Sequence, residues 1–173
     1  MQTFYSFTQF FANVCSVHPN ITTFDMSDIR TLDTEKQTLF PYANLIVNNV
    51  NIDSGVMTYN VTFMVMDRVV EVEEVSSGVF NEITKNYKGY SNVMDVWNST
   101  LLTINDVVSY VYRNPDALDY NVIGSSLCTP FEERFQNLLA GWAVDMNIAV
   151  GNPQDMCVIN LSTALAAGGD ATC

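Results

Sequence analysis

Apolar residues between Ser91 and Tyr112 recur every three or four positions, and this is the strongest periodic signal in the chain. The stripe consists of Val93, Val96, Trp97, Leu101, Ile104, Val107, Val108 and Val111. A period of 3.6 residues places such side chains on one face of an α-helix. Ser91 is placed to cap this helix, and Asp95 suits the positive end of its dipole. The pattern predicts a long helix that lies across a sheet.

Strand patterns flank this helix on both sides. Val56 to Asp67 alternates apolar and polar residues, and Leu39 to Ile52 has an apolar centre followed by turn residues, so the two runs predict a β-hairpin. Leu118 to Ile123 predicts a short strand, which ends at a Gly124-Ser125-Ser126 break before the polar run Pro130 to Asn137. A last strand is predicted by alternating apolar residues, Trp142, Val144, Met146, Ile148 and Val150.

The N-terminal segment Thr3 to Val17 predicts a second helix, which stops before His18-Pro19 because a residue preceding proline avoids the α region. Its apolar face consists of Phe4, Phe7, Phe11 and Val14. Either the domain's own sheet or a neighbouring subunit must cover so much aromatic surface. The polar stretch Ile21 to Asp33 is interpreted as an extended arm or a short strand.

The chain has 173 residues, 48% of them apolar, which is enough for the core of one compact domain. The order of elements predicts an α+β fold, an antiparallel β-sheet packed against a long α-helix and an N-terminal helix. We expect residues 1–160 to form this domain and the Gly-rich residues 161–173 to form a flexible C-terminal tail. Val69 to Val75 either prolongs the second strand or leads into a projecting loop near residues 69–90.

The charge excludes several classes of function. Seven basic residues face 19 acidic ones, a net charge of -12, so the chain lacks the Lys and Arg that non-specific binding of DNA, RNA or anionic lipid requires. No basic residue precedes the apolar N-terminal stretch, and no 18 apolar residues run together, so we expect a soluble protein made in a reducing cytoplasm. Four cysteines without a C-x-x-C pair predict reduced thiols rather than zinc ligands.

No arrangement of residues predicts an enzyme, and we assign no catalytic, cofactor-binding or metal-binding residue. His18, the sole histidine, precedes a proline at a helix end and is expected to cap or lie at the surface rather than act as a base. The phosphate-binding motifs G-x-G-x-x-G and G-x-x-x-x-G-K-[ST] do not occur, nor does G-x-S-x-G. Glu71, Glu73 and Glu74 alternate sides on an extended segment, which favours a solvated acidic cluster over a cation site. A metal-dependent enzyme using scattered carboxylates stays open as an alternative.

Three stretches carry a family resemblance: His18 to Asn49, Asn92 to Val111, and Pro130 to Val150 followed by Cys157. Their motifs are His18-Pro19, Lys36 with Phe40-Pro41, Met66-Asp67, and Pro130, Phe131, Arg134 and Phe135 with Gly141-Trp142. Over about 130 of the 173 residues the chain resembles small structural proteins of tailed bacteriophages, including crAss-like phages and marine relatives.

The resemblance implies a tail-terminator-like or neck ring subunit, assembled in the host cytoplasm and located in the virion between portal and tail. Such rings have six or twelve copies, contact portal, adaptor or tail proteins, and let DNA pass without specific binding; no membrane is involved.

A closed ring joins two unlike patches of each subunit. The expected interface residues are Phe4, Phe7, Phe11, Val70, Val72 and Val75. The expected lumen or solvated acidic residues are Glu71, Glu73 and Glu74. The alternative is a secreted or surface-attached module that binds a glycan or protein through its Asn- and Thr-rich strands.

Overall fold

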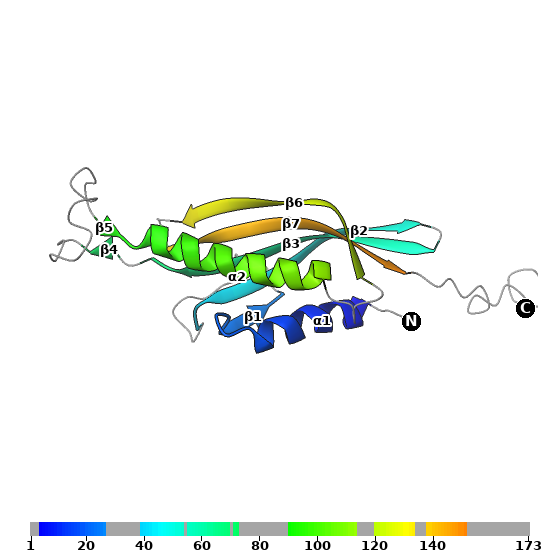
Figure 1. Ribbon diagram of the computed structural model, residues 1–173, viewed down its shortest axis with the longest axis horizontal. Helices are drawn as coiled ribbons and strands as arrows, with labels where there is room; N and C mark the ends of the chain where they lie inside the picture. Colours follow the sequence, from blue (N-terminus) through cyan, green and yellow to red (C-terminus); the bar gives the residue numbers. More distant parts are fainter. Residues whose placement is uncertain are drawn as a thin grey trace, which may run out of the picture.

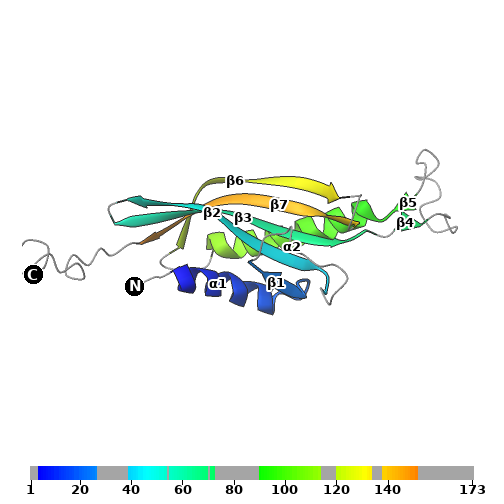
Figure 2. The same cartoon turned by 180° about the vertical axis from the view of Figure 1, so that it is seen from behind.

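The computed structural model describes residues 4–26, 39–53, 55–69, 71–72, 90–113, 120–133 and 138–151. These residues form an α+β fold in which two helices lie on one face of a five-stranded sheet (Figures 1 and 2). In spatial order the strands are β1 (Thr23–Asp25), β2 (Tyr42–Asp53), β3 (Val56–Arg68), β7 (Leu139–Gly151) and β6 (Tyr120–Glu133). β1 pairs in parallel with β2 and the other neighbours are antiparallel, so the sheet is mixed and the prediction of a purely antiparallel sheet is wrong at this edge.

The predicted hairpin is confirmed as β2 and β3. Their register runs from Tyr42 opposite Met66 to Asp53 opposite Val56, with one irregularity between Val47 and Asn49. Gly55 adopts a φ of 84°, a left-handed conformation that glycine reaches without a steric penalty. The alternation of β3 shows which of its side chains face the helices, and the register extends this assignment to the paired residues of β2.

The helix α2 spans Val93–Arg113 and begins two residues after the predicted cap. Ser91 belongs instead to β5 (Tyr90–Ser91), which pairs with β4 (Glu71–Val72) in a separate two-stranded sheet. The Val96 N–H donates to the Asn92 carbonyl at 3.0 Å, so the first turn of the helix closes on Asn92. Within the described residues neither helix is long and apolar enough to cross a membrane.

Two predicted features fall on residues that the structure does not describe. β3 ends at Arg68, and most of the predicted projecting loop, residues 73–89, lies outside the described residues. The predicted C-terminal tail, 161–173, also lies outside them.

The core lies between the helices and the central strands. α1 (Phe4–Val17) turns Phe7 and Phe11 onto the sheet, where the ring of Phe7 stacks on that of Tyr59 with centroids 4.3 Å apart. The helix-facing side chains of α2 and the strands complete this cluster, among them Leu45, Val61, Phe63, Val107, Val144 and Ile148. The chain's own sheet thus covers most of the aromatic face of α1.

β6 corrects the prediction of a short strand that ends at a Gly124-Ser125-Ser126 break before a polar run. It is one strand of 14 residues along the sheet edge. A register shift between Ile123 and Leu127, with Gly124 at a φ of 79°, absorbs the Gly-Ser-Ser segment as a bulge. Pro130 is tolerated because an edge strand has one side without ladder hydrogen bonds.

Two tryptophans join α2 to the sheet. Trp142 of β7 faces α2, as predicted, and its Nε1 donates to the Trp97 carbonyl at 2.9 Å. The Nε1 of Trp97 donates in turn to the Phe131 carbonyl of β6 at 3.1 Å. Helix α2 is therefore tied to both C-terminal strands by hydrogen bonds as well as by packing.

Candidate functional surfaces of the sheet

A row of polar side chains crosses the sheet face opposite the helices. The strand register places Asn60 of β3 opposite Asn147 of β7, and Thr62 opposite Asp145. The irregularity in β2 brings Asn48 beside both residues of β3. These five residues, Asn48, Asn60, Thr62, Asp145 and Asn147, form what we term the polar row.

Hydrogen bonds link the whole polar row. The Nδ2 of Asn48 donates to the Asn60 Oδ1 at 3.0 Å and to the Thr62 Oγ1 at 2.9 Å. The Nδ2 of Asn60 donates to the Asn147 Oδ1 at 2.9 Å, and the Thr62 hydroxyl donates to the Asp145 Oδ1 at 2.6 Å. Such a row holds amide and hydroxyl groups in fixed positions on an exposed surface, where they can hydrogen-bond a polar ligand.

The polar row cannot be identified from the sequence alone. Its members come from three strands, and they meet through pairings between residues up to 87 positions apart. The alternation of Thr58, Asn60 and Thr62 with apolar residues shows that they share one face, but only the register shows which residues they meet.

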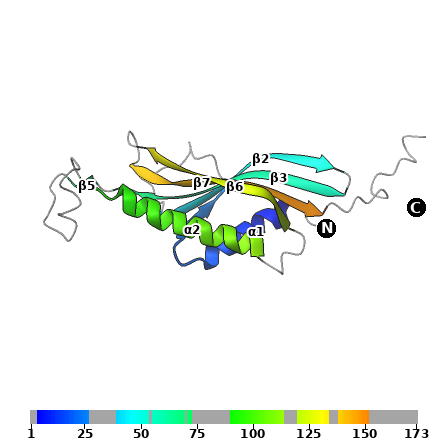
Figure 3. The same ribbon diagram turned by 45° about the horizontal axis from the view of Figure 1, so that its top comes forward.

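A second surface lies at the end of the β2–β3 hairpin, which extends beyond both helices (Figure 3). Val50 and Ile52 pair with Tyr59 and Met57, so they are on the helix-facing side of the sheet. The described residues leave both partly exposed: Val50 is 36% and Ile52 is 70% exposed. Phe4, at the start of α1, is 52% exposed and its ring lies 6.2 Å from that of Tyr59. We term Phe4, Val50 and Ile52 the hairpin patch.

The structure corrects two of the expected interface residues. Phe7 and Phe11 are fully buried in the chain's own core because α1 turns them toward the sheet, so they are not available to a second copy. Phe4, one turn before Phe7, stays half-exposed and belongs to the hairpin patch. Sequence periodicity places all three on one face but could not show that Phe4, at the start of α1, keeps half of its surface exposed.

Two of the other expected residues, Glu71 and Val72, form β4. The backbones of Glu71 and Val72 pair with Ser91 and Tyr90. Val70, Glu73, Glu74 and Val75 lie outside the described residues. Their assignment to an interface or a lumen stays a prediction.

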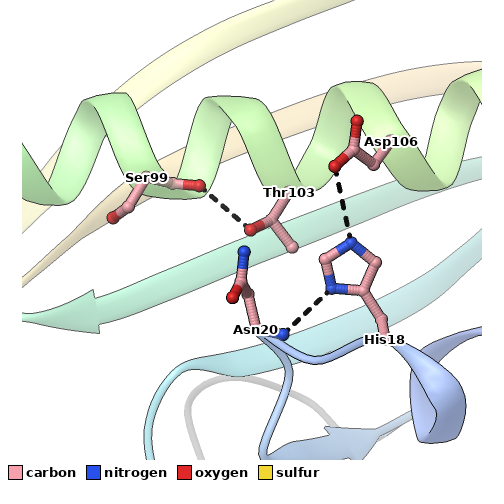
Figure 4. A network of polar contacts seen from close by, with 5 residues as sticks. All are labelled: His18, Asn20, Ser99, Thr103 and Asp106. Atoms are coloured by element: carbon pink, nitrogen blue, oxygen red, sulfur yellow. Dashed lines mark hydrogen bonds and ion pairs between the residues drawn. The ribbon is translucent and has the colours of Figure 1, made fainter.

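His18 links the end of α1 to α2 (Figure 4). Its Nδ1 accepts a hydrogen bond from the Asn20 backbone N–H at 3.2 Å, which holds the turn after α1 and does not cap the carbonyls of the helix. Its Nε2 lies 3.8 Å from the Asp106 Oδ2, and the nearby Thr103 hydroxyl donates to the Ser99 carbonyl at 3.0 Å. The two imidazole nitrogens thus face the Asn20 N–H and the Asp106 carboxylate, which hold the ring in place. The Thr103 hydroxyl bonds to its own helix and not to His18.

The described cysteines are poor nucleophiles. Burial raises the pKa of the Cys15 thiol from 9.0 to about 12, and it also raises the pKa of the half-buried Cys128. A raised pKa leaves little thiolate at neutral pH, and the thiolate is the reactive species. Both thiols are free. In the described ranges no three His, Cys, Asp or Glu side chains gather closely enough to hold a metal ion.

Negative charge dominates the described part of the chain. Nine of its residues are Asp or Glu, and two, Arg68 and Arg113, are basic. The guanidinium of Arg68 lies over the Phe40 ring, 5.5 Å from its centroid. The described surface therefore has few cations with which to bind phosphates.

Comparison with known proteins adds no family to these observations. No protein-family model matches the chain, and no curated protein matches it either. The functional interpretation depends on the surfaces described above and on the motifs in the sequence.

Proposed function

We propose that this chain is a structural subunit that assembles with copies of itself into a closed ring, a tail-terminator-like ring of a bacteriophage neck through which DNA passes between portal and tail. The hairpin patch is the observation that carries the proposal. Its side chains continue the apolar core, yet the described residues of the chain leave them exposed. An exposed extension of a core is typical of a surface that a partner covers.

The outer edge of β2 supports assembly at the same place. β1 pairs with Tyr42, Ala43 and Asn44 alone, so no described strand lies beside the outer side of Asn49–Asp53. An unpaired edge offers a row of backbone N–H and C=O groups to another chain. The opposite edge, β6, carries Pro130 and a bulge, features that discourage an added strand. The two edges of the sheet are therefore unlike, as the head-to-tail contacts of a ring require.

The charge suits a conduit for DNA. Each lysine or arginine that contacts a phosphate releases counterions and strengthens binding, so a channel lined by carboxylates does not retain DNA. The described residues carry nine carboxylates against two arginines. In this proposal the ring contacts portal, adaptor or tail proteins above and below it, and the chain has no catalytic role.

The mass of the particle in solution tests the proposal. Light scattering of the purified full chain should give six or twelve times the subunit mass of 19.3 kDa, alone or after addition of the neighbouring ring protein. Ile52→Asp should reduce assembly, because it places a charge in the hairpin patch. Met94→Asp is the matched control, since Met94 is 71% exposed and lies on α2 near the opposite end of the molecule (Figure 1). A monomer at every concentration and with every partner would contradict the proposal.

The polar row favours a second candidate, a secreted or surface-attached module that binds a glycan or a protein. Amide and hydroxyl groups fixed on an open face match the hydroxyl groups of a sugar. In a glycan-binding assay this alternative predicts binding that Asn60→Ala and Asn147→Ala abolish, together with a monomeric mass. A ring that binds no glycan would exclude it.

A further inference from the structure

The chain continues past the hairpin patch. β7 ends at Gly151, which pairs with Val56, and the preceding Val150 pairs with Met57. Met57 pairs in turn with Ile52 of the hairpin patch. The 22 residues from 152 to 173 therefore follow β7 at the end of the sheet where the described residues leave the apolar face exposed.

These 22 residues include one markedly apolar run, Met156-Cys157-Val158-Ile159, followed by Asn160 and Leu161. Its β-branched residues suit an extended strand. The run starts five residues after Gly151, and five extended residues span up to ~17 Å. A strand added to the outer edge of β2 would lie three strand spacings from β7, ~14 Å away. The connection is thus longer than a return to the same chain requires, and it can place the run beside another copy.

We propose that residues 156–161 of one copy add as a strand to the outer edge of β2, beside Asn49–Asp53, of the neighbouring copy. This inference rests on the proposed function and names the contact that would close the ring. An added strand places every second side chain on the helix-facing side, next to Val50 and Ile52. It covers the hairpin patch and pairs the free edge in a single contact.

This strand exchange supplies both of the unlike patches that meet in a ring contact: the apolar segment and the β2 edge. Each copy gives one apolar segment and receives one, so a closed ring leaves no hairpin patch exposed. The segment and the edge are on the same end of one subunit, and exchange between copies needs no change in the core. Such exchange of an element between identical subunits is a low-cost route to assembly.

Disulfide trapping in the full chain tests this contact. Ile52→Cys supplies one thiol and the native Cys157 the other, while Cys128→Ser and Cys173→Ser remove competing thiols. Cys15 stays, because it is fully buried. Under mild oxidation we expect disulfide-linked dimers and larger species on a non-reducing gel, which reductant removes. The control carries Met94→Cys in place of Ile52→Cys and should give no such species, because a disulfide forms only between Cα atoms about 4.4–6.8 Å apart.

Each other outcome overturns the inference. A disulfide within one chain, identified by mass spectrometry at the monomer mass, would show that the segment folds onto its own hairpin patch. A yield no higher than that of the Met94→Cys control would show that the segment lies elsewhere. Light scattering keeps the two proposals apart: a six- or twelve-fold particle without the crosslink overturns this contact alone, whereas a monomer overturns the proposed function as well.

Discussion

Gly141 lies where the backbone of β7 comes closest to that of β3. A Cβ atom at this position would clash with the Val65 carbonyl oxygen and would lie 2.8 Å from the Cα of Met66. Both are backbone atoms of the paired β3–β7 ladder, so no side-chain rotation relieves the clash. Gly141→Ala therefore forces the two central strands apart.

The expected cost follows from this geometry. Overpacking a well-packed site costs about 1–3 kcal/mol, and a clash with backbone belongs at the upper end, ~3 kcal/mol. For a chain of this size each kcal/mol lowers the melting temperature by about 2–4 °C, so we expect a decrease of about 6–12 °C. Gly151→Ala, in the same strand, is the matched control, because a Cβ there meets no atom within 4 Å.

Thermal unfolding followed by circular dichroism measures both variants. Gly151→Ala should melt near the wild-type temperature, since surface substitutions usually change stability by less than about 0.5 kcal/mol. If Gly141→Ala melts within about 2 °C of Gly151→Ala, a shift worth at most about 1 kcal/mol, the pairing of β3 with β7 is not as described.

Three further predictions concern the Trp142 contact, the buried thiol and DNA. Trp142→Ala should lower the free energy of unfolding by about 3 kcal/mol in urea titrations. Trp142→Phe, which loses the hydrogen bond to the Trp97 carbonyl, should lower it by about 1 kcal/mol, and an unchanged stability of this variant would argue against that bond. Burial raises the pKa of Cys15 from 9.0 to about 12, so the stability that the neutral thiol contributes is present below pH 9 and is lost as the pH rises toward 12. Cys15→Ala should make the free energy of unfolding depend less on pH in this range. An unchanged pH dependence would refute the raised pKa of Cys15. The full chain should not retard duplex DNA in a mobility-shift assay at physiological salt, and a retarded band would contradict a conduit that does not bind phosphates.

The periodic parts of the fold were predictable from the sequence. The β2–β3 hairpin, the apolar side of β7 and the buried faces of α1 and α2 follow from side-chain patterns that depend on local geometry alone. Trp142 was expected to face α2, and its indole donates to the carbonyl of Trp97. Because each of these elements buries one face, the spacing of its apolar residues indicates which face that is.

Features that depend on distant pairing were not predictable in the same way. The parallel pairing of β1 joins Thr23 to Tyr42, and a three-residue strand has too few side chains to show a period. The Gly124-Ser125-Ser126 segment indicates a break, yet pairing with β7 on both sides keeps it within β6 as a bulge. Secondary structure was overridden by tertiary contacts in both places.

The candidate surfaces were predictable in part. Phe4 was expected at an interface and belongs to the hairpin patch, whereas Phe7 and Phe11 are covered by the sheet. Val50 and Ile52 were not singled out, because their exposure depends on how far the hairpin extends beyond the helices. The polar row required the register of three strands. The register of the strands decides which side chains meet across the sheet. The local sequence pattern limits the possible registers but does not select one.

Electron microscopy of the purified full chain, alone and with the proposed portal, adaptor or tail partner, decides whether the chain forms a ring. We expect class averages of a closed ring with six- or twelve-fold symmetry around an open channel. Separate subunits in both samples, or an assembly without a central opening, would contradict it.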